Sequence, residues 1–238
     1  MALAWFHPME IVINNMNTAN EKAHNILATL AHEPRLGRYV NNLPLPDIHR
    51  GTEKIKLVIL GQDPTVKNPK SWTRITIVLN LDKPGSLRRY LTAICSDLGL
   101  DLDKNVYATN YFKNFFSSPP TTITEIHVFK EFAPHWLPLL QKELAEFPQV
   151  SVITLGQPLL SAVVTGDVSP RVRDYWGYTN NWKSGERGTY SYLQSSDNVL
   201  NRVVFPFPHQ PSVGKQFYAD RLQDYVAFIR ERMSMICR

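Results

Sequence analysis

Short apolar runs alternate with segments of helical periodicity along the chain. Four runs that are rich in β-branched and aromatic residues predict strands, over residues 56–60, 106–110, 150–155 and 203–207. Apolar residues at helical spacing predict helices over residues 19–33, 87–98, 124–147, 158–164 and 215–233. Because the strands are continuously apolar and helices separate them, we expect a parallel sheet that is covered on both faces. The pattern therefore predicts an α/β fold, with a three-layer α/β/α arrangement around a central, mostly parallel four-stranded sheet.

Local signals mark where two of these helices begin, end or bend. Ser86 has the character of an N-cap before the helix over residues 87–98, and Gly99 follows as a C-terminal glycine. Pro134 and Pro138 fall inside the segment 124–147. Each proline lacks a backbone N–H, so we expect the pair to bend or divide that helix.

The segment from residue 167 to residue 201 departs from the pattern. Aromatic and basic side chains stand there among Gly, Ser and Asn. One interpretation is a surface excursion that packs on its own aromatic rings, and the other is a DNA-facing element that combines cations with stacking rings. We favour the first, and expect residues 1–238 to form one domain with this segment as an insertion or lid.

Composition narrows the class of protein. With 238 residues, 43% of them hydrophobic and 20% charged, the chain suits one globular α/β domain rather than a disordered or fibrous protein. The net charge of +5 fits a polyanionic partner, because basic groups neutralise phosphates. Cys95 and Cys237 do not have the spacing of a metal site, so we expect no metal and no cofactor. We see neither a leader at the N-terminus nor a run long enough to span a bilayer, so we expect a cytoplasmic protein without membrane attachment.

Three of the predicted strands end in groups that can do chemistry. Asp63 follows the first strand in the segment Gly61-Gln62-Asp63-Pro64, Asn110 ends the second, and His209 follows the fourth. Ligands bind beyond the carboxyl ends of parallel strands, so these side chains are expected at one edge of the sheet. An acid in such a place can orient or deprotonate a water. In the alternative interpretation, Asp63 caps its own loop, Asn110 bonds to the backbone nearby, and His209 is a structural histidine.

The three segments also resemble a known family. VILGQDP is similar to the water-activating motif of the uracil-DNA glycosylase superfamily, VYATNYFKN to its second strand, and PFPHQPSV to its C-terminal histidine segment. The resemblance runs in order from about residue 56 to the C-terminus. It implies a monofunctional DNA glycosylase that hydrolyses the N-glycosidic bond of uracil or a related damaged base in base excision repair. The alternative is a catalytically inactive, nucleic-acid-binding relative of the same fold. The chain has no GxSxG or HExxH segment in support of another class of hydrolase.

The resemblance assigns a role to each candidate residue. Asp63 would hold the attacking water, and His209 would stabilise the departing base. The base itself would be bound by Gln62, Asn110, Thr65 and Phe112. The DNA strand would be bound by Ser86, Ser212, Val213 and Lys215. DNA is thus the expected partner, bound with the target base flipped out of the stack by a monomeric protein.

The chain also departs from the family pattern. Thr65 stands where the family carries a tyrosine that excludes a 5-methyl group, which leaves room for other 5-substituted bases. No aromatic residue is evident at the position that stacks on the base, so Trp72 or Phe112 is expected to supply the ring. Val213 replaces the leucine that fills the gap left by the flipped base, and Gln210 separates His209 from the following proline.

Overall fold

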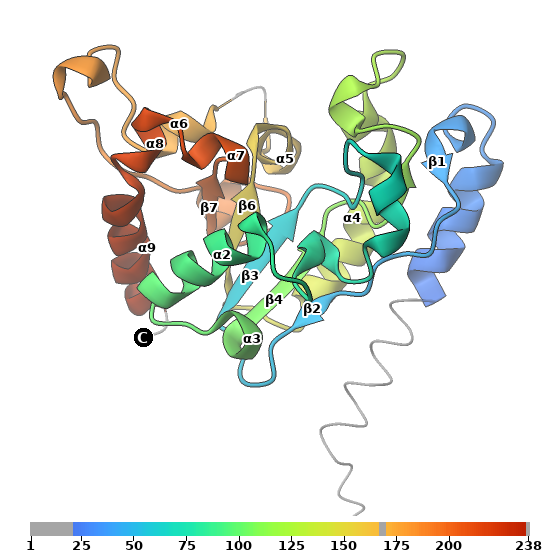
Figure 1. The fold of residues 1–238 in the computed structure, drawn as a ribbon, viewed down its shortest axis with the longest axis horizontal. Coiled ribbons are helices and arrows are strands. Elements are labelled where there is room, and N and C mark those ends of the chain that lie inside the picture. Colours follow the sequence, from blue (N-terminus) through green and yellow to red (C-terminus); the bar gives the residue numbers. More distant parts are fainter. Residues whose placement is uncertain (1–20, 167–169, 237–238) are drawn as a thin grey trace, which may run out of the picture.

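The computed structural model describes residues 21–166 and 170–236. Its main sheet has five strands in the order β2-β4-β3-β6-β7 (Figure 1). Their bounds are His49–Arg50 for β2, Leu57–Gly61 for β3, Val106–Asn110 for β4, Ser151–Leu155 for β6 and Val204–Phe207 for β7. The β2 strand pairs antiparallel with β4, and every other pair in this sheet is parallel.

The predicted four-stranded sheet is therefore wrong by one strand. All four predicted strands are present within one residue of their expected bounds, and β2 adds an antiparallel edge. That strand contains only two half-buried residues, too few to show an alternating pattern in the sequence. A separate two-stranded sheet joins β1 (Val40–Asn41) to β5 (Phe115–Phe116).

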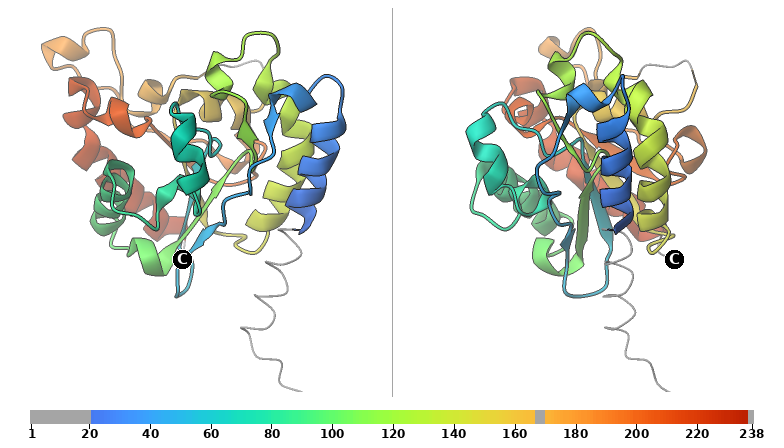
Figure 2. Two further views of the ribbon diagram at one scale, coloured as in Figure 1. Left: turned by 45° about the vertical axis from the view of Figure 1, so that its right-hand side comes forward. Right: turned by 90° about the vertical axis from the view of Figure 1, so that its right-hand side faces the viewer.

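Helices lie on both sides of the main sheet (Figures 1 and 2). Residues 21–32 form the first helix, and those that follow are α2 (Ser86–Asp97), α3 (Leu102–Asn105), α4 (Val128–Leu144), α5 (Gln157–Val163), α6 (Val172–Tyr175), α7 (Gln210–Val213), α8 (Gln216–Ala219) and α9 (Leu222–Ile236). Short 3-10 turns are η1 (Gly37–Tyr39), η2 (Pro69–Arg74), η3 (Val78–Asn80), η4 (Pro120–Thr122), η5 (Trp182–Ser184) and η6 (Ser195–Asp197). The α2 helix, with α9 packed on it, covers one side, while α4 and the first helix cover the other.

Three details of the helices differ from expectation. The α4 helix continues through Pro134 and Pro138, so of the two expected outcomes, a bend or a division, the division does not occur. The helix predicted over residues 215–233 is interrupted after α8, where the buried Arg221 donates to the carbonyl of Phe217 and its guanidinium stacks on that ring. Ser86 is the first residue of α2 rather than its cap, because Gly85 occupies the N-cap position. Gly99, with φ of +73°, follows the end of α2 as predicted.

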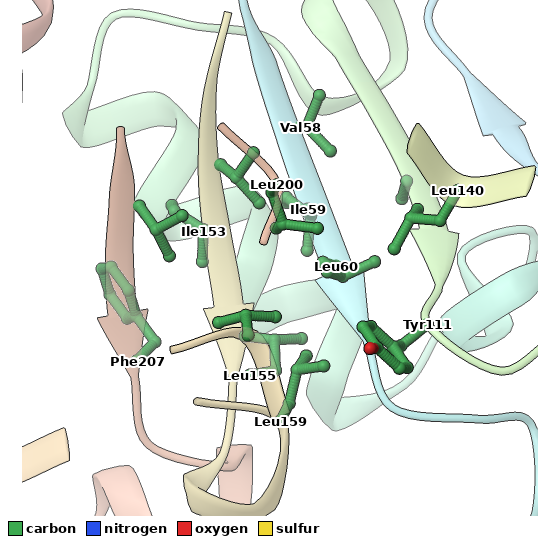
Figure 3. Close-up of a cluster of buried hydrophobic side chains, with 14 of the residues drawn as sticks. Val58, Ile59, Leu60, Tyr111, Leu140, Ile153, Leu155, Leu159, Leu200 and Phe207 are labelled. Atoms are coloured by element: carbon green, nitrogen blue, oxygen red, sulfur yellow. The ribbon is translucent and has the colours of Figure 1, made fainter. Parts of the chain in front are cut away.

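The core fills the space between the sheet and its helices. All residues of β3, β4, β6 and β7 are buried. Figure 3 shows side chains of β3, β6 and β7 gathered with Leu140 of α4 and Leu159 of α5. Continuous burial on both faces is what the apolar strand patterns predicted.

Aromatic rings of the segment 167–201 pack inward. Trp176 is fully buried, donates through Nε1 to the carbonyl of Pro206, and lies 4.4 Å from Tyr225 between ring centroids. Tyr190 packs on the same Tyr225 and on Phe228 of α9. These rings therefore attach the segment to β7 and α9. Residues 167–169 of this segment lie outside the described residues.

Within the described ranges, no helix is long and apolar enough to cross a membrane. The N-terminal segment on which the expectation about a leader depends, residues 1–20, lies outside those ranges, as does Cys237.

Candidate functional site

A cleft of about 780 Å³ lies at the carboxyl ends of the parallel strands. Its walls include Gly61 at the end of β3, Leu155 at the end of β6 and Pro208 just after β7. The predicted site residues that line this cleft are Gln62, Asp63, Thr65, His209, Ser212 and Lys215. The fold thus brings together residues from two segments that are almost 150 positions apart in the sequence.

Asp63 is held in the cleft wall by two hydrogen bonds. Its Oδ1 accepts from the backbone N–H of Thr65 at 2.7 Å, and its Oδ2 accepts from Nε2 of Gln62 at 2.9 Å. Burial raises the pKa of Asp63 to about 6, although these hydrogen bonds act in the opposite direction. The carboxyl group is therefore ionised at pH 7 yet close enough to its pKa to accept a proton, as a general base requires. It also caps its own turn, so the structural interpretation holds beside the chemical one.

His209 lines the same cleft as Asp63, although it lies near the C-terminal end of the sequence. It follows Pro208 and occupies the N-cap position of α7. Desolvation in the cleft lowers the pKa of His209 from its ordinary value, which favours the neutral imidazole, a form that can donate one N–H. Gly156, at the end of β6, lies beside it and has φ of +99°, a conformation that favours glycine.

Asn110 lies behind the cleft wall rather than in it. It pairs with Gly61 in the register of β3 and β4, and its side chain is buried. Neither amide atom of Asn110 has a hydrogen-bond partner among the residues that the structure describes. A Cβ placed on Gly61 would collide with Oδ1 of Asn110 and would lie 2.6 Å from Cδ2 of Leu79. Leaving a buried polar group unpaired costs about 1–3 kcal/mol, so this amide is a costly feature of the fold.

Thr65 reaches the cleft, but its hydroxyl group has a structural partner. The hydroxyl oxygen accepts from the backbone N–H of Phe116 at 2.8 Å and so connects the Asp63 loop to β5. The space that a tyrosine would occupy is therefore bordered by a small side chain whose polar atom is already bonded.

The two rings expected to stack on a base are not brought to the cleft. Phe112 is fully buried and packs against Phe129, with 5.1 Å between ring centroids, and against Phe116 at 5.5 Å. Trp72 is buried against Phe115 in a small second core and donates through Nε1 to the carbonyl of Val66. Both rings are packed against other side chains, so neither has a face on which a base could stack.

The candidate DNA-binding residues divide into two groups. Ser212 and Lys215 line the cleft. Ser86 is exposed at the start of α2, next to Leu87, which does line the cleft. Val213 is half-buried in α7 and is not among the lining residues.

Sequence reasoning missed several residues of the cleft. A Gly-Gln pair stands at the end of both strands: Gly61 is the last residue of β3 and Gln62 follows it, and Gly156 and Gln157 follow β6. That repeated pair was an available signal. The Gln157 side chain donates to the carbonyl of Pro170 and accepts from the N–H of Val172, which places Val172 in the wall. For Leu79 no signal existed, because it lies in an unremarkable apolar run.

Comparison with known proteins adds no relative. No protein-family model matches the chain, and no curated protein matches it significantly. The family resemblance therefore depends on the three motifs alone.

Proposed function

We propose that this protein is a monofunctional DNA glycosylase that hydrolyses the N-glycosidic bond of uracil or a related damaged base in DNA. The observation that carries the proposal is that Asp63 and His209, which follow different strands, line one cleft. Their electrostatics suit the reaction: the pKa of Asp63 is about 6, so its carboxyl group is ionised at pH 7, and desolvation of His209 favours the neutral imidazole. Helices on both sides of the sheet also support the predicted three-layer α/β/α architecture.

The reaction adds water across the bond between C1′ of the sugar and the base. Asp63 orients the water, accepts its proton as the oxygen bonds to C1′, and stabilises positive charge on the sugar. The electrons of the breaking bond remain on the base, and the N–H of His209 donates a hydrogen bond to the carbonyl oxygen where negative charge accumulates. Gln62 and Thr65 border the space for the base, while Asn110 would bind its amide edge. The proton balance closes when the released base anion takes up a proton and Asp63 gives the proton of the water to solvent.

The mouth of the cleft suits an anionic strand. Ser212 and Lys215 line it, and Lys67 adds a second cation. The chain carries a net charge of +5, which favours association with phosphates. We propose that these residues, with Ser86 and Val213 nearby, bind the DNA backbone around a flipped base, and that a cytoplasmic monomer acts in base excision repair.

The proposal is tested by incubating the protein with uracil-containing single-stranded and double-stranded oligonucleotides and counting abasic sites. We expect excision by the wild type, and a decrease of about 10²–10⁴-fold in the single-turnover rate for Asp63→Asn, with DNA affinity nearly unchanged. Asp97→Asn is a matched control, since it makes the same change at an exposed residue at the end of α2 that does not line the cleft. Absence of excision of uracil and related bases at protein excess would overturn the proposal.

A second candidate function is supported by the position of Asn110. Because its amide lies behind Leu79 and Gly61, the cleft is incomplete as a base pocket in this conformation. A non-catalytic nucleic-acid-binding protein would bind oligonucleotides with an affinity that falls as salt rises, without forming abasic sites. Asp63→Asn would then have no effect beyond the local electrostatic change in affinity for DNA.

A further inference from the structure

Leu79 lies where the cleft meets the side chain of Asn110. The Leu79 side chain lines the cleft, and its Cδ2 stands 2.6 Å from the point that a Cβ on Gly61 would occupy. Oδ1 of Asn110 crowds the same point. Asn110 itself is not among the lining residues and is 1% exposed. Leu79 and Asn110 are therefore neighbours on the same side of Gly61, and of the two only Leu79 lines the cleft.

The backbone at Leu79 is strained. Leu79 has φ of 59° and ψ of 12°, and Asn80 has φ of 53°, so two consecutive residues with side chains adopt the left-handed conformation. For a leucine this conformation brings Cβ close to the following carbonyl oxygen. Such strain persists where the surroundings impose it, and it is concentrated at ligand-binding and switching sites. A leucine in a strained backbone conformation can move to a less strained conformation if its neighbours leave room for it.

The amide of Asn110 is a recognition group without a partner. It offers donors on Nδ2 and an acceptor on Oδ1, which together match a planar heterocycle that has an N–H beside a carbonyl. Buried amides in folded proteins nearly always find partners. Here the described residues supply none, and the Leu79 side chain, which crowds the same point beside Gly61 as Oδ1 of Asn110, lines the cleft.

We infer that Leu79 is a movable cover over Asn110 and a specificity-determining residue of the cleft: a heterocycle reaches the amide only after the Leu79 side chain moves aside. The identity of that heterocycle as a nucleobase rests on the proposed function. The covered form lowers the apparent affinity in proportion to the fraction of molecules that are open. The size of the side chain at residue 79 thus controls which ligands reach Asn110, and how tightly they bind.

The experiment titrates free uracil into the full-length, ¹⁵N-labelled protein and follows the side-chain amide signal of Asn110. We compare wild type with Leu79→Ala and with Leu87→Ala, a control leucine that lines the same cleft but is not at Gly61. We expect Leu79→Ala to bind uracil at least about fivefold more tightly, with a shift of the Asn110 signal, as an increased open fraction requires. Leu87→Ala should stay within about twofold of wild type on the same grounds. Should Leu79→Ala fail to fold, Leu79→Gly takes its place, because glycine accepts the left-handed backbone.

A second measurement needs no ligand. Exchange of the Asn110 amide protons with water should be faster in Leu79→Ala than in wild type, and unchanged in Leu87→Ala. Equal exchange rates and equal uracil affinities in wild type and Leu79→Ala would overturn the inference that Leu79 covers Asn110, even in a protein that excises uracil. Conversely, differences in both exchange rate and uracil affinity, in a protein that forms no abasic sites, would support the role of Leu79 as a cover and contradict the proposed glycosylase activity.

Discussion

Two adjacent residues of β4, Thr109 and Asn110, point to opposite faces of the sheet and meet opposite surroundings. The Thr109 hydroxyl donates to Oε2 of Glu143 at 3.1 Å and accepts from Nζ of Lys113 at 2.5 Å. Lys113 also contacts the same carboxylate at 2.7 Å, and the hydroxyl of Tyr107 donates to it. Asn110, one residue further, has no partner for either atom among the described residues.

The difference between Thr109 and Asn110 distinguishes polar groups that stabilise the fold from polar groups that remain free to bind a ligand. On the α4 side of the sheet, a buried cation, a carboxylate and two hydroxyls satisfy one another without solvent. Burial lowers the pKa of Lys113, and the charge of Glu143 opposes that shift. On the cleft side, by contrast, the fold leaves an amide unpaired and holds a leucine in a strained conformation beside it. Four predictions test this contrast, in order of decreasing effect.

The largest effect is expected from breaking the Lys113 network. Lys113→Ala leaves the buried Glu143 carboxylate without its cation, and we expect the free energy of unfolding to fall by about 3–5 kcal/mol. Urea denaturation followed by circular dichroism measures the change. The control is Arg187→Ala, which removes an exposed ion pair with Asp224 and should cost less than about 1 kcal/mol. Similar losses in the two variants would contradict a structural role for the network.

The second prediction concerns the charge of Asp63. Its pKa is about 6 in the folded protein and near 3.8 when unfolded, so the folded state binds more protons between these values. Stability therefore falls as pH rises from about 4 to about 6 and stays lower above that. Asp63→Asn should remove this dependence: the wild type loses about 2 kcal/mol between pH 4 and pH 7.5, after allowance for partial exposure, and the variant does not. The variant also loses one acceptor, because the Nδ2 of an asparagine cannot accept from Gln62 or from Thr65. At pH 3 the two proteins should differ little.

Activity should respond to the same ionisation in the opposite direction. Excision by wild type is expected to decrease as pH falls through about 6, because the protonated Asp63 cannot accept a proton from water. A rate that is constant from pH 5 to pH 8 would remove Asp63 from the role of base.

The third prediction concerns the unpaired amide. Asn110→Leu replaces an unsatisfied polar side chain by an apolar one of similar shape, so we expect the free energy of unfolding to rise by about 1 kcal/mol. Thermal and urea denaturation measure this change, while uracil excision should be lost. Thr109→Val, the matched change on the other face, should lower stability, since it removes a partner of Lys113 and Glu143. Destabilisation by both substitutions would show that the two faces do not differ.

Much of the fold followed from the sequence because its strands are long enough and apolar enough to be recognised. The two-residue strand β2 was missed, since so short a segment has no periodicity. The helix α4 was expected to bend or divide at Pro134 and Pro138 and is not divided, because Phe132, Trp136 and Leu140 bury one of its faces in the core.

The sequence predicted those residues of the candidate site that follow the ends of strands. It did not predict those whose positions depend on tertiary packing. Asp63 and His209 reach the cleft because the carboxyl ends of parallel strands share an edge of the sheet. Phe112 does not, since its ring is enclosed by other aromatic side chains that only the tertiary fold brings together. The position of Leu79 over Asn110 arises from a left-handed turn in a segment without glycine, and local sequence gives no indication of it.

The smallest effect is expected at Thr65, which both stabilises the fold and faces the cleft. Thr65 lines the cleft, yet its hydroxyl accepts from the N–H of Phe116 and so acts as part of the scaffold. Thr65→Val should lower the free energy of unfolding by about 1 kcal/mol, equivalent to about 2–4 °C in Tm, because that N–H loses its acceptor. Thr65→Ser retains the acceptor and serves as the control in the same thermal scan. Excision of uracil at pH 8 should change by less than about fivefold in Thr65→Val, since the backbone N–H that binds Asp63 remains in place, although the side chain of Thr65 no longer helps to lower the pKa of Asp63. A large loss of excision with no loss of stability would instead move the Thr65 hydroxyl from the scaffold to the chemistry.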